Sequence, residues 1–170
     1  GKIQQDIYES YQYLISQNLA KPNSACIMGG SFGAYSALQS ASLYPDTYNC
    51  AIGNAGIYDL EMMYDEGDIQ LKRFGISYLK RVIGEDLEVL HAMSPVYRVD
   101  KIKSPIMLAH GEEDERAPIE QYEQLEEALN KANKPFERFV MSKEMHGFFK
   151  PENQKAYMDK VIGFLNKHLN

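Results

Sequence analysis

The sequence predicts an α/β domain with a mainly parallel β-sheet and helices on both of its faces. Three short apolar runs have the length and composition of buried strands, at Ala25–Met28, Cys50–Gly53 and Ile106–Ala109, and a fourth strand is predicted at Phe136–Met141. Segments with helical spacing of apolar residues separate these runs. Strands that alternate with helices are typical of a parallel sheet. The chain has 170 residues, 44% of them hydrophobic and 25% charged, which is enough to bury the core of one domain.

The first half of the chain is predicted to form a helix, a strand, a second helix and a second strand. Apolar side chains recur at helical spacing over residues 3–19, and Pro22 ends that helix. The continuous apolar run Ala25–Met28 predicts a strand that is buried on both faces. The small residues of Ala34–Leu43 favour a closely packed helix, and Cys50–Gly53 predicts the next buried strand.

The second half begins with an irregular segment and returns to the strand–helix alternation. Residues 58–100 are expected to be partly helical, with helices near Gly75–Ile83 and Leu87–Met93. The third strand follows, and Pro118 suits the first turn of the next helix. After the fourth strand a last amphipathic helix is expected over Asn153–Leu169.

Composition and charge narrow the classes of function. A net charge of −6 argues against a nucleic-acid partner, because phosphate binding needs a concentrated basic surface. No apolar run approaches the roughly 20 residues that span a bilayer, so no membrane partner is expected. Cys26 and Cys50 are too few for a disulfide framework, and each is expected to pack inside a buried strand. The cellular compartment stays open.

A serine flanked by glycines follows the first predicted strand. Gly29-Gly30-Ser31-Phe32-Gly33 matches the G-x-S-x-G nucleophile elbow, in which the serine occupies a strained strand-to-helix turn. Glycines on either side of Ser31 are expected to avoid Cβ clashes with neighbouring elements. The backbone N–H of Phe32 is expected to be one oxyanion-hole donor. A turn without chemistry is the alternative for the motif alone, whereas a phosphate-binding loop would need a Lys after the glycines.

An acid and a histidine follow later strands in the order that this motif requires. Asp114 lies in the loop after Ile106–Ala109, and His146 lies in the loop after Phe136–Met141. Both loops leave the carboxyl ends of parallel strands, on the same edge as Ser31, where ligands bind in open α/β sheets. The chain order Ser…Asp…His is that of the α/β-hydrolase fold, so the three side chains are predicted to form a catalytic triad.

Other side chains compete for the acid and base roles. His110 is expected to end the third strand as a hydrogen-bonded structural residue, while His91 and His168 lie on predicted helices, where a surface role is expected. Asp114 itself could be a solvated loop charge. The rival acids beside it are Glu112, Glu113 and Glu115.

Taken together, these motifs resemble the C-terminal catalytic domain of the prolyl oligopeptidase family, which includes acylaminoacyl peptidases and dipeptidyl peptidases. The similarity covers nearly the whole chain. Ala34 stands where family members usually have a second glycine, a change that we expect to be tolerated. The similar stretches are residues 27–35, Ser94-Pro95, Ser104-Pro105-Ile106, residues 110–118 and His146-Gly147-Phe148.

The resemblance implies a serine peptidase that hydrolyses short peptides through an acyl-enzyme, without a cofactor or a metal. It implies that Arg116 holds a substrate carbonyl, with a surface ion pair to a nearby Glu as the alternative. It also implies that Tyr35 and Tyr64 lie near the primary specificity pocket. An esterase or carboxylesterase with the same triad is the alternative within the same enzyme class.

The resemblance further implies that residues 1–170 are the C-terminal portion of an α/β-hydrolase domain, truncated on its N-terminal side. Only one predicted helix precedes Ala25–Met28, whereas the family has several strands there and an N-terminal propeller. The second oxyanion donor, a tyrosine hydroxyl from the early segment, would then be absent. The first strand would be an exposed edge, through which a homo-oligomer is expected. A catalytically inactive fragment that acts only within a larger assembly is the remaining alternative.

Overall fold

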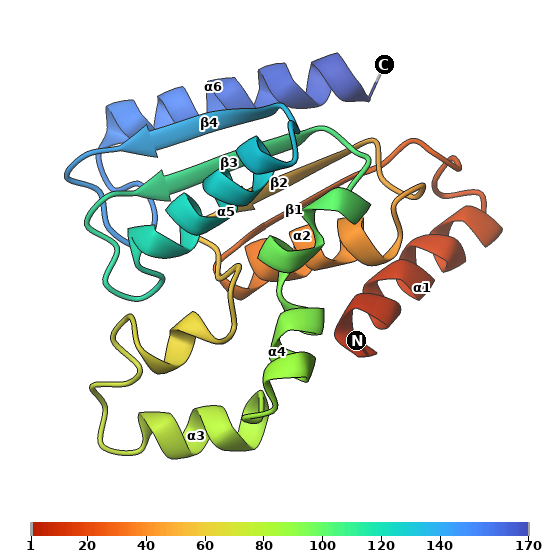
Figure 1. Ribbon diagram of the computed structural model, residues 1–170. Coiled ribbons are helices and arrows are strands. Elements are labelled where there is room, and N and C mark those ends of the chain that lie inside the picture. The colour runs from red at the N-terminus through yellow and green to blue at the C-terminus, as the bar shows by residue number, and fades with distance from the viewer. Residues whose placement is uncertain (1, 170) are drawn as a thin grey trace.

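A four-stranded parallel sheet organises the structure, a computed structural model that describes residues 2–169. Its strands lie in chain order, β1 (Cys26–Gly30), β2 (Cys50–Asn54), β3 (Ile106–Gly111) and β4 (Phe136–Met141), as Figure 1 shows. All three pairings are parallel. The order of α/β elements predicted from the sequence is therefore confirmed, and every strand ends at the same edge of the sheet.

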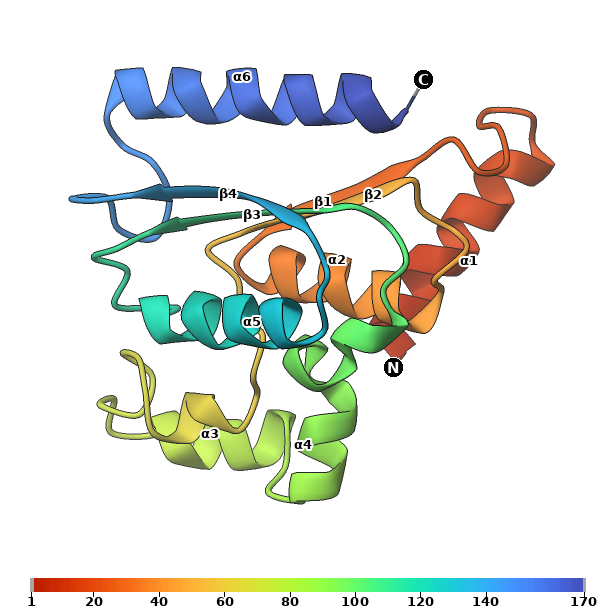
Figure 2. The same cartoon turned by 45° about the horizontal axis from the view of Figure 1, so that its top comes forward.

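Helices cover both faces of the sheet. The helices α2 (Phe32–Leu43) and α5 (Ile119–Lys131) lie on one face, and α6 (Pro151–His168) lies on the other (Figure 2). Short side chains let α2 approach the strands closely, because Ala34, Ala37 and Ala41 are buried against them. The first helix, α1 (Lys2–Ser16), packs beside α2.

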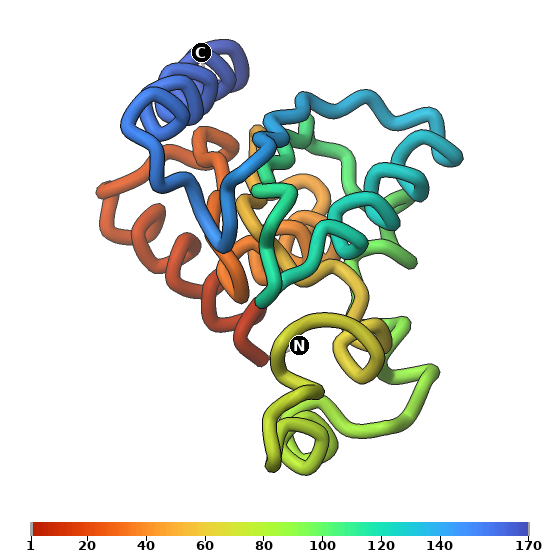
Figure 3. The backbone as a smooth tube through the Cα atoms, turned by 90° about the vertical axis from the view of Figure 1, so that its left-hand side faces the viewer, coloured from red at the N-terminus to blue at the C-terminus, as the bar shows by residue number. Residues whose placement is uncertain are grey.

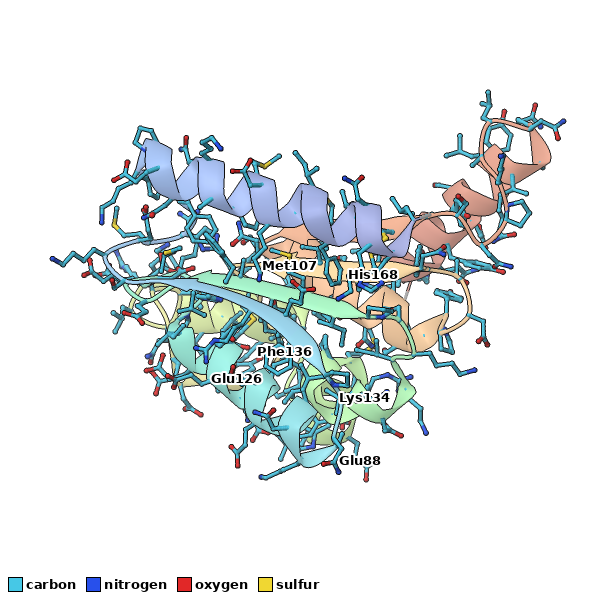
Figure 4. The ribbon with its side chains drawn as sticks, turned by 90° about the horizontal axis from the view of Figure 1, so that it is seen from above. Glu88, Met107, Glu126, Lys134, Phe136 and His168 are labelled. Atoms are coloured by element: carbon cyan, nitrogen blue, oxygen red, sulfur yellow. A yellow bond between two sulfur atoms is a disulfide. The ribbon has the colours of Figure 1, made fainter. Side chains whose placement is uncertain are left out.

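Two apolar layers hold the sheet between these helices. Met107 of β3 lies in the layer under α6, whereas Phe136 of β4 packs in the layer that α5 covers (Figure 4). Such a division follows from the strand geometry, since successive side chains point to opposite faces. No helix among residues 2–169 is long and apolar enough to cross a bilayer.

The irregular segment between β2 and β3 forms a small helical unit beside the main body. It contains the short 3₁₀ helix η1 (Met62–Tyr64), α3 (Gly75–Val82), α4 (Leu87–Met93) and the 3₁₀ turns of η2 (Pro95–Lys101). Figures 1 and 3 show α3 and α4 projecting away from the sheet. A third apolar cluster joins this unit to α2, because Tyr35 packs with Leu60 and Leu90.

The first strand is not buried on both faces, so that prediction is wrong. β1 is an edge of the sheet, as the truncation argument expected. Met28 is 48% exposed on the face that α6 covers elsewhere. The core under α6 is built from β2, β3 and β4, and from β1 only Cys26 packs against it. An apolar run in the sequence shows that a strand is hydrophobic. How much of that strand is buried depends on the helices and strands packed against it.

The two cysteines form a disulfide, which corrects the expectation that each only packs inside its strand. Cys26 and Cys50 are direct partners in the parallel register of β1 and β2, with Cα atoms 4.6 Å apart. That separation lies within the range that a disulfide bridges. The pairing depends on the register between two strands, which no local pattern in the sequence reports.

Candidate active site

Ser31 occupies the turn between β1 and α2 with an unusual backbone. Its φ of 57° and ψ of −123° lie outside the regions that side-chain-bearing residues ordinarily adopt. The N–H of Ser31 donates to the Asn54 carbonyl at the end of β2, at 2.8 Å, which holds the turn against the sheet. The strained strand-to-helix turn predicted from the motif is therefore present at Ser31.

The two flanking glycines of the motif differ in their steric need. A Cβ on Gly29 would lie 2.3 Å from the backbone carbon of Gly33, so only glycine fits there. A Cβ on Gly33 would meet nothing within 4 Å. The expectation of a clash at both glycines is thus wrong for Gly33. The backbone of Gly33 faces Gly29, but a side chain on Gly33 itself would point into open space.

The carboxyl edge of the sheet brings three distant loops together. Ser31 follows β1, Asp114 follows β3 and His146 follows β4. Figure 3 looks onto this edge, where the three connections converge. Nε2 of His146 lies 2.9 Å from Oγ of Ser31, and Nδ1 of His146 lies 2.8 Å from Oδ2 of Asp114. The three side chains predicted from their order in the sequence form one continuous hydrogen-bonded chain.

Backbone groups orient the carboxylate of Asp114. Its Oδ1 accepts hydrogen bonds from the N–H groups of Arg116 and Ala117, both at 2.9 Å. Oδ2 faces the imidazole of His146 at 2.8 Å and that of His110 at 3.5 Å, and no part of the Asp114 side chain is exposed. An acceptor at this place favours the tautomer with a proton on Nδ1, so Nε2 can accept the Ser31 hydroxyl proton.

The remaining histidines lie outside this hydrogen-bonded chain, although Nε2 of His110 is 3.5 Å from Oδ2 of Asp114. His110 is fully buried at the end of β3, where Nε2 lies 2.7 Å from the Ala117 carbonyl, which agrees with the structural role expected for it. Burial lowers the pKa of His110 and keeps its ring neutral. His91 is not merely a surface residue, because it is half-buried and pairs with Glu61. Its ring also packs on Tyr97, with centroids 4.1 Å apart.

The N–H of Phe32 stands at the first position of α2, beside Ser31. Helix N-terminal N–H groups lack intrahelical partners and carry partial positive charge. The Phe32 N–H donates none of the hydrogen bonds found within residues 2–169, so it is available to a negatively charged oxygen. Because the Phe32 side chain is 53% exposed, it forms part of the surface around Ser31.

An apolar cavity of roughly 390 Å³ opens beside Phe32 and Tyr35. Tyr35 lines it, and burial raises the pKa of Tyr35 to about 12, so its hydroxyl stays protonated. The other walls come from α1, from the loop after β2, and from η1, α3 and α4. These residues are Ile3, Gln4, Ile57, Leu60, Met63, Tyr78, Leu79, Val82, Ile83, Val89, Leu90 and Met93.

The sequence pattern did not identify most of these cavity residues. It predicted helices near α3 and α4, but a helix prediction does not say which surface the apolar side chains of the helix will cover. Tyr64, in contrast, does not line the cavity. Its hydroxyl donates to the Gly84 carbonyl and joins η1 to the end of α3.

Arg116 is exposed beside Asp114, and no ion pair joins its guanidinium to a carboxylate within residues 2–169. The surface ion pair considered as its alternative role is therefore not formed. In the same described part of the chain, no group of three His, Cys, Asp or Glu side chains is arranged to hold a metal ion.

The chain is similar in sequence and in fold to known peptidases. The chain is 28% identical over 169 residues to dipeptidyl aminopeptidase BIII of Pseudoxanthomonas mexicana, an alignment that covers 97% of this chain and 24% of that protein. A puromycin-hydrolyzing peptidase of Mycobacterium tuberculosis superposes with a TM-score of 0.89 at 24% identity, over 98% of this chain and 25% of that one. Pyrococcus horikoshii acylaminoacyl peptidase gives a TM-score of 0.87 at 24% identity, over 98% and 27%.

These similar structures share the α/β-hydrolase fold, and the chain spans about a quarter of the length of each of these three proteins. A profile of the prolyl oligopeptidase family matches residues 1–170, which is the whole of the sequence. The chain therefore belongs to the prolyl oligopeptidase family.

Proposed function

We propose that this chain is the catalytic part of a serine peptidase that hydrolyses short peptides through an acyl-enzyme. The observation that carries the proposal is the placement of His146 between Ser31 Oγ and Asp114 Oδ2. Membership of the prolyl oligopeptidase family supports peptides as the substrate class. The net charge of −6 argues against a nucleic-acid partner, because phosphate binding needs a basic surface.

In the proposed reaction, Ser31 Oγ attacks the scissile carbonyl while Nε2 of His146 takes the hydroxyl proton. Asp114 holds the Nδ1–H and stabilises the imidazolium that forms. The developing oxyanion accepts from the Phe32 N–H at the positive end of α2. His146 then gives its proton to the leaving amine. Water attacks the acyl-enzyme with His146 again as the base, which releases the acid and restores Ser31.

The cavity beside Phe32 and Tyr35 suits an apolar side chain on the acyl side of the scissile bond. Its walls are almost entirely aliphatic or aromatic, and Gln4 is the one amide side chain among them. Burial of an apolar side chain contributes about 1.5–3 kcal/mol, and a charged side chain would lose its hydration there. Arg116 lies exposed beside the triad, where its guanidinium could hold a substrate carbonyl.

The direct test treats the chain with a fluorophosphonate and locates the adduct by mass spectrometry. We expect modification of Ser31 and none in Ser31→Ala. Turnover of N-acetyl-phenylalanyl-p-nitroanilide is expected to exceed that of the aspartyl analogue, because the cavity is apolar. Turnover of p-nitrophenyl esters alone would assign a carboxylesterase instead. A chain that neither reacts nor turns over any substrate would contradict the proposal and favour an inactive fragment.

A further inference from the structure

The loop that carries His146 is long and irregular. Residues 142–150 connect β4 to α6 without regular secondary structure, and Lys143 and Gly147 have φ values of 60° and 122°. Within this loop one short backbone hydrogen bond, from the Gly147 N–H to the Met145 carbonyl, is formed. Such a segment does not by itself hold an imidazole within hydrogen-bonding distance of Ser31, so contacts from outside the turn must do so.

Glu144, two residues before His146, supplies contacts on the side that faces α6. Its side chain is buried, with 1% of the residue exposed. Oε2 accepts from the Phe149 N–H at 2.8 Å, while Oε1 accepts from the Lys150 N–H at 3.1 Å and from Nδ2 of Asn153 at 2.7 Å. The hydrogen bond from Phe149 is the main cause of the lowered pKa of Glu144, so the carboxylate is charged at neutral pH.

The backbone of Glu144 is held from the opposite side, by the loop that carries Asp114. The Glu113 N–H donates to the Glu144 carbonyl at 2.9 Å. Gly111 allows this contact, because a Cβ there would lie 2.4 Å from the Glu144 carbonyl oxygen and 2.3 Å from that of Met145. Glu144 therefore joins the Asp114 loop, through its carbonyl, to the start of α6, through its carboxylate, and His146 lies between these two attachments.

We propose that Glu144 is a positioning residue for His146, which its buried carboxylate and its carbonyl together hold against Ser31 and Asp114. The inference rests on the proposed function, in which His146 is the base. The hydrogen bonds of the Glu144 carboxylate go to Phe149, Lys150 and Asn153 and not to a reacting side chain, so Glu144 acts through the loop. A cap that merely stabilised α6 would support the helix but would not affect the imidazole.

The variant Glu144→Gln tests this role with almost no change in volume. Its amide must turn an NH₂ group toward at least one of the three donors, which opens the attachment to α6. We expect the second-order rate of fluorophosphonate labelling at Ser31 to fall by roughly a hundredfold, the scale that follows from a misplacement of about 1 Å. KM for the peptide anilide is expected to change little, because the cavity lies on other elements.

A spectroscopic readout separates positioning from a structural role. The downfield proton resonance of His146 Nδ1–H, assigned by its loss in Asp114→Asn, is expected to weaken or vanish in Glu144→Gln while circular dichroism stays unchanged. Glu152→Gln is the matched control, since Glu152 also lies at the start of α6 but is exposed and bridges no loop. In that variant both the labelling rate and the resonance are expected to match the wild type.

The outcomes are distinct for the two proposals. Wild-type labelling rate and resonance in folded Glu144→Gln would overturn the positioning role, as would equal losses in Glu152→Gln. If the wild-type chain does not react at Ser31 at all, the proposed function fails. The role of Glu144 is then decided by whether the His146 Nδ1–H resonance weakens in Glu144→Gln. The double variant Glu144→Gln/Asn153→Asp gives a further check. It lets the new amide donate to residue 153, and partial recovery of the resonance is expected.

Discussion

Single residues in this site are held mainly by backbone groups. Asp114 has one oxygen fixed by two N–H groups of its own loop, and only the other oxygen reaches His146. Ser31 is fixed by the Asn54 carbonyl and keeps a positive φ. Because backbone groups hold these residues in place, Ser31 Oγ and Asp114 Oδ2 remain available to His146. Replacement of a single atom in one of these side chains is therefore expected to disturb the site.

Asp114→Asn is the sharpest test at this scale. An amide beside Nδ1 would donate a proton if its NH₂ faced the ring, and it would remove the negative charge that stabilises the imidazolium in either orientation. We expect labelling of Ser31 to fall by on the order of 10⁴-fold. Glu113→Gln, a neighbouring exposed carboxylate, should react like the wild type. Labelling of Asp114→Asn at the wild-type rate would show that Asp114 does not serve His146.

Because His110 is buried, we expect the folded chain to lose stability in mild acid. Burial lowers its pKa in the folded chain, whereas in the unfolded chain it titrates near its ordinary value of about 6.5. Below that pH the unfolded state binds the extra proton, so the free energy of unfolding falls as the pH drops through about 6.5. Urea unfolding at several pH values measures this slope. It should be shallower in His110→Gln than in the control His168→Gln, and equal slopes would be evidence against the buried neutral ring.

At the scale of elements, the turn from β1 to α2 depends on one close approach of two backbones. Gly29 faces the backbone of Gly33, and the strand and helix can meet only because Gly29 has no Cβ. The same turn aims the first N–H groups of α2 at the space next to Ser31. The motif therefore allows close packing of β1 against α2, and its two flanking glycines differ because only Gly29 requires the absence of a Cβ.

The pair Gly29→Ala and Gly33→Ala tests this asymmetry. The first adds a methyl group 2.3 Å from backbone atoms, so we expect a loss of about 1–3 kcal/mol in the free energy of unfolding, together with slower labelling of Ser31. The second adds a methyl group to open space on a helix and should leave the stability the same or slightly higher. Thermal unfolding compares them, and equal losses would rule out the contact between the two backbones.

The disulfide is the covalent link between β1 and β2. It closes a loop across a sequence separation of 24 residues, which in the chain-entropy account contributes about 3 kcal/mol to stability. We expect reduction to lower the urea midpoint by a corresponding amount. Cys26→Ser/Cys50→Ser should behave like the reduced protein and should not respond to reductant. A midpoint in the wild type that is independent of reductant would mean that the bond does not form in solution.

At the scale of the whole molecule, the sheet has an exposed edge at β1 with a half-covered apolar face. We propose that two copies associate through this edge, where Met28 is 48% exposed. Unpaired backbone groups and apolar side chains both favour pairing with another strand.

Light scattering across a concentration series tests this association. We expect dimers whose dissociation constant rises by roughly tenfold or more in Met28→Lys, because a charge replaces buried apolar surface. Met158→Lys, at a side chain of similar exposure on α6, should not change the association. A monodisperse monomer at high concentration would be contrary to the proposal, and equal effects of both substitutions would place the contact elsewhere.

The sequence by itself determined the elements and the order of the reacting residues. Continuous apolar runs predicted β1 to β3, and a fourth strand was expected where β4 lies. Helices were expected at the positions of α1 to α6, and α4 has the predicted bounds of Leu87–Met93. These features could be predicted because periodicity and turn chemistry are local. The triad candidates Ser31, Asp114 and His146 were also accessible, since a parallel sheet brings all strand ends to one edge whatever the details of packing.

Only the tertiary structure decided how distant residues meet. The pairing of Cys26 with Cys50 depends on strand register, and the exposure of Met28 depends on which strands α6 covers. The apolar cavity joins α1, α2, η1, α3 and α4, and the buried carboxylate of Glu144 is recognisable only by the donors around it. The physical reason is the same in each case. Such contacts arise from the packing of complementary surfaces, which depends on the relative placement of whole elements and not on the neighbours of a residue in the chain.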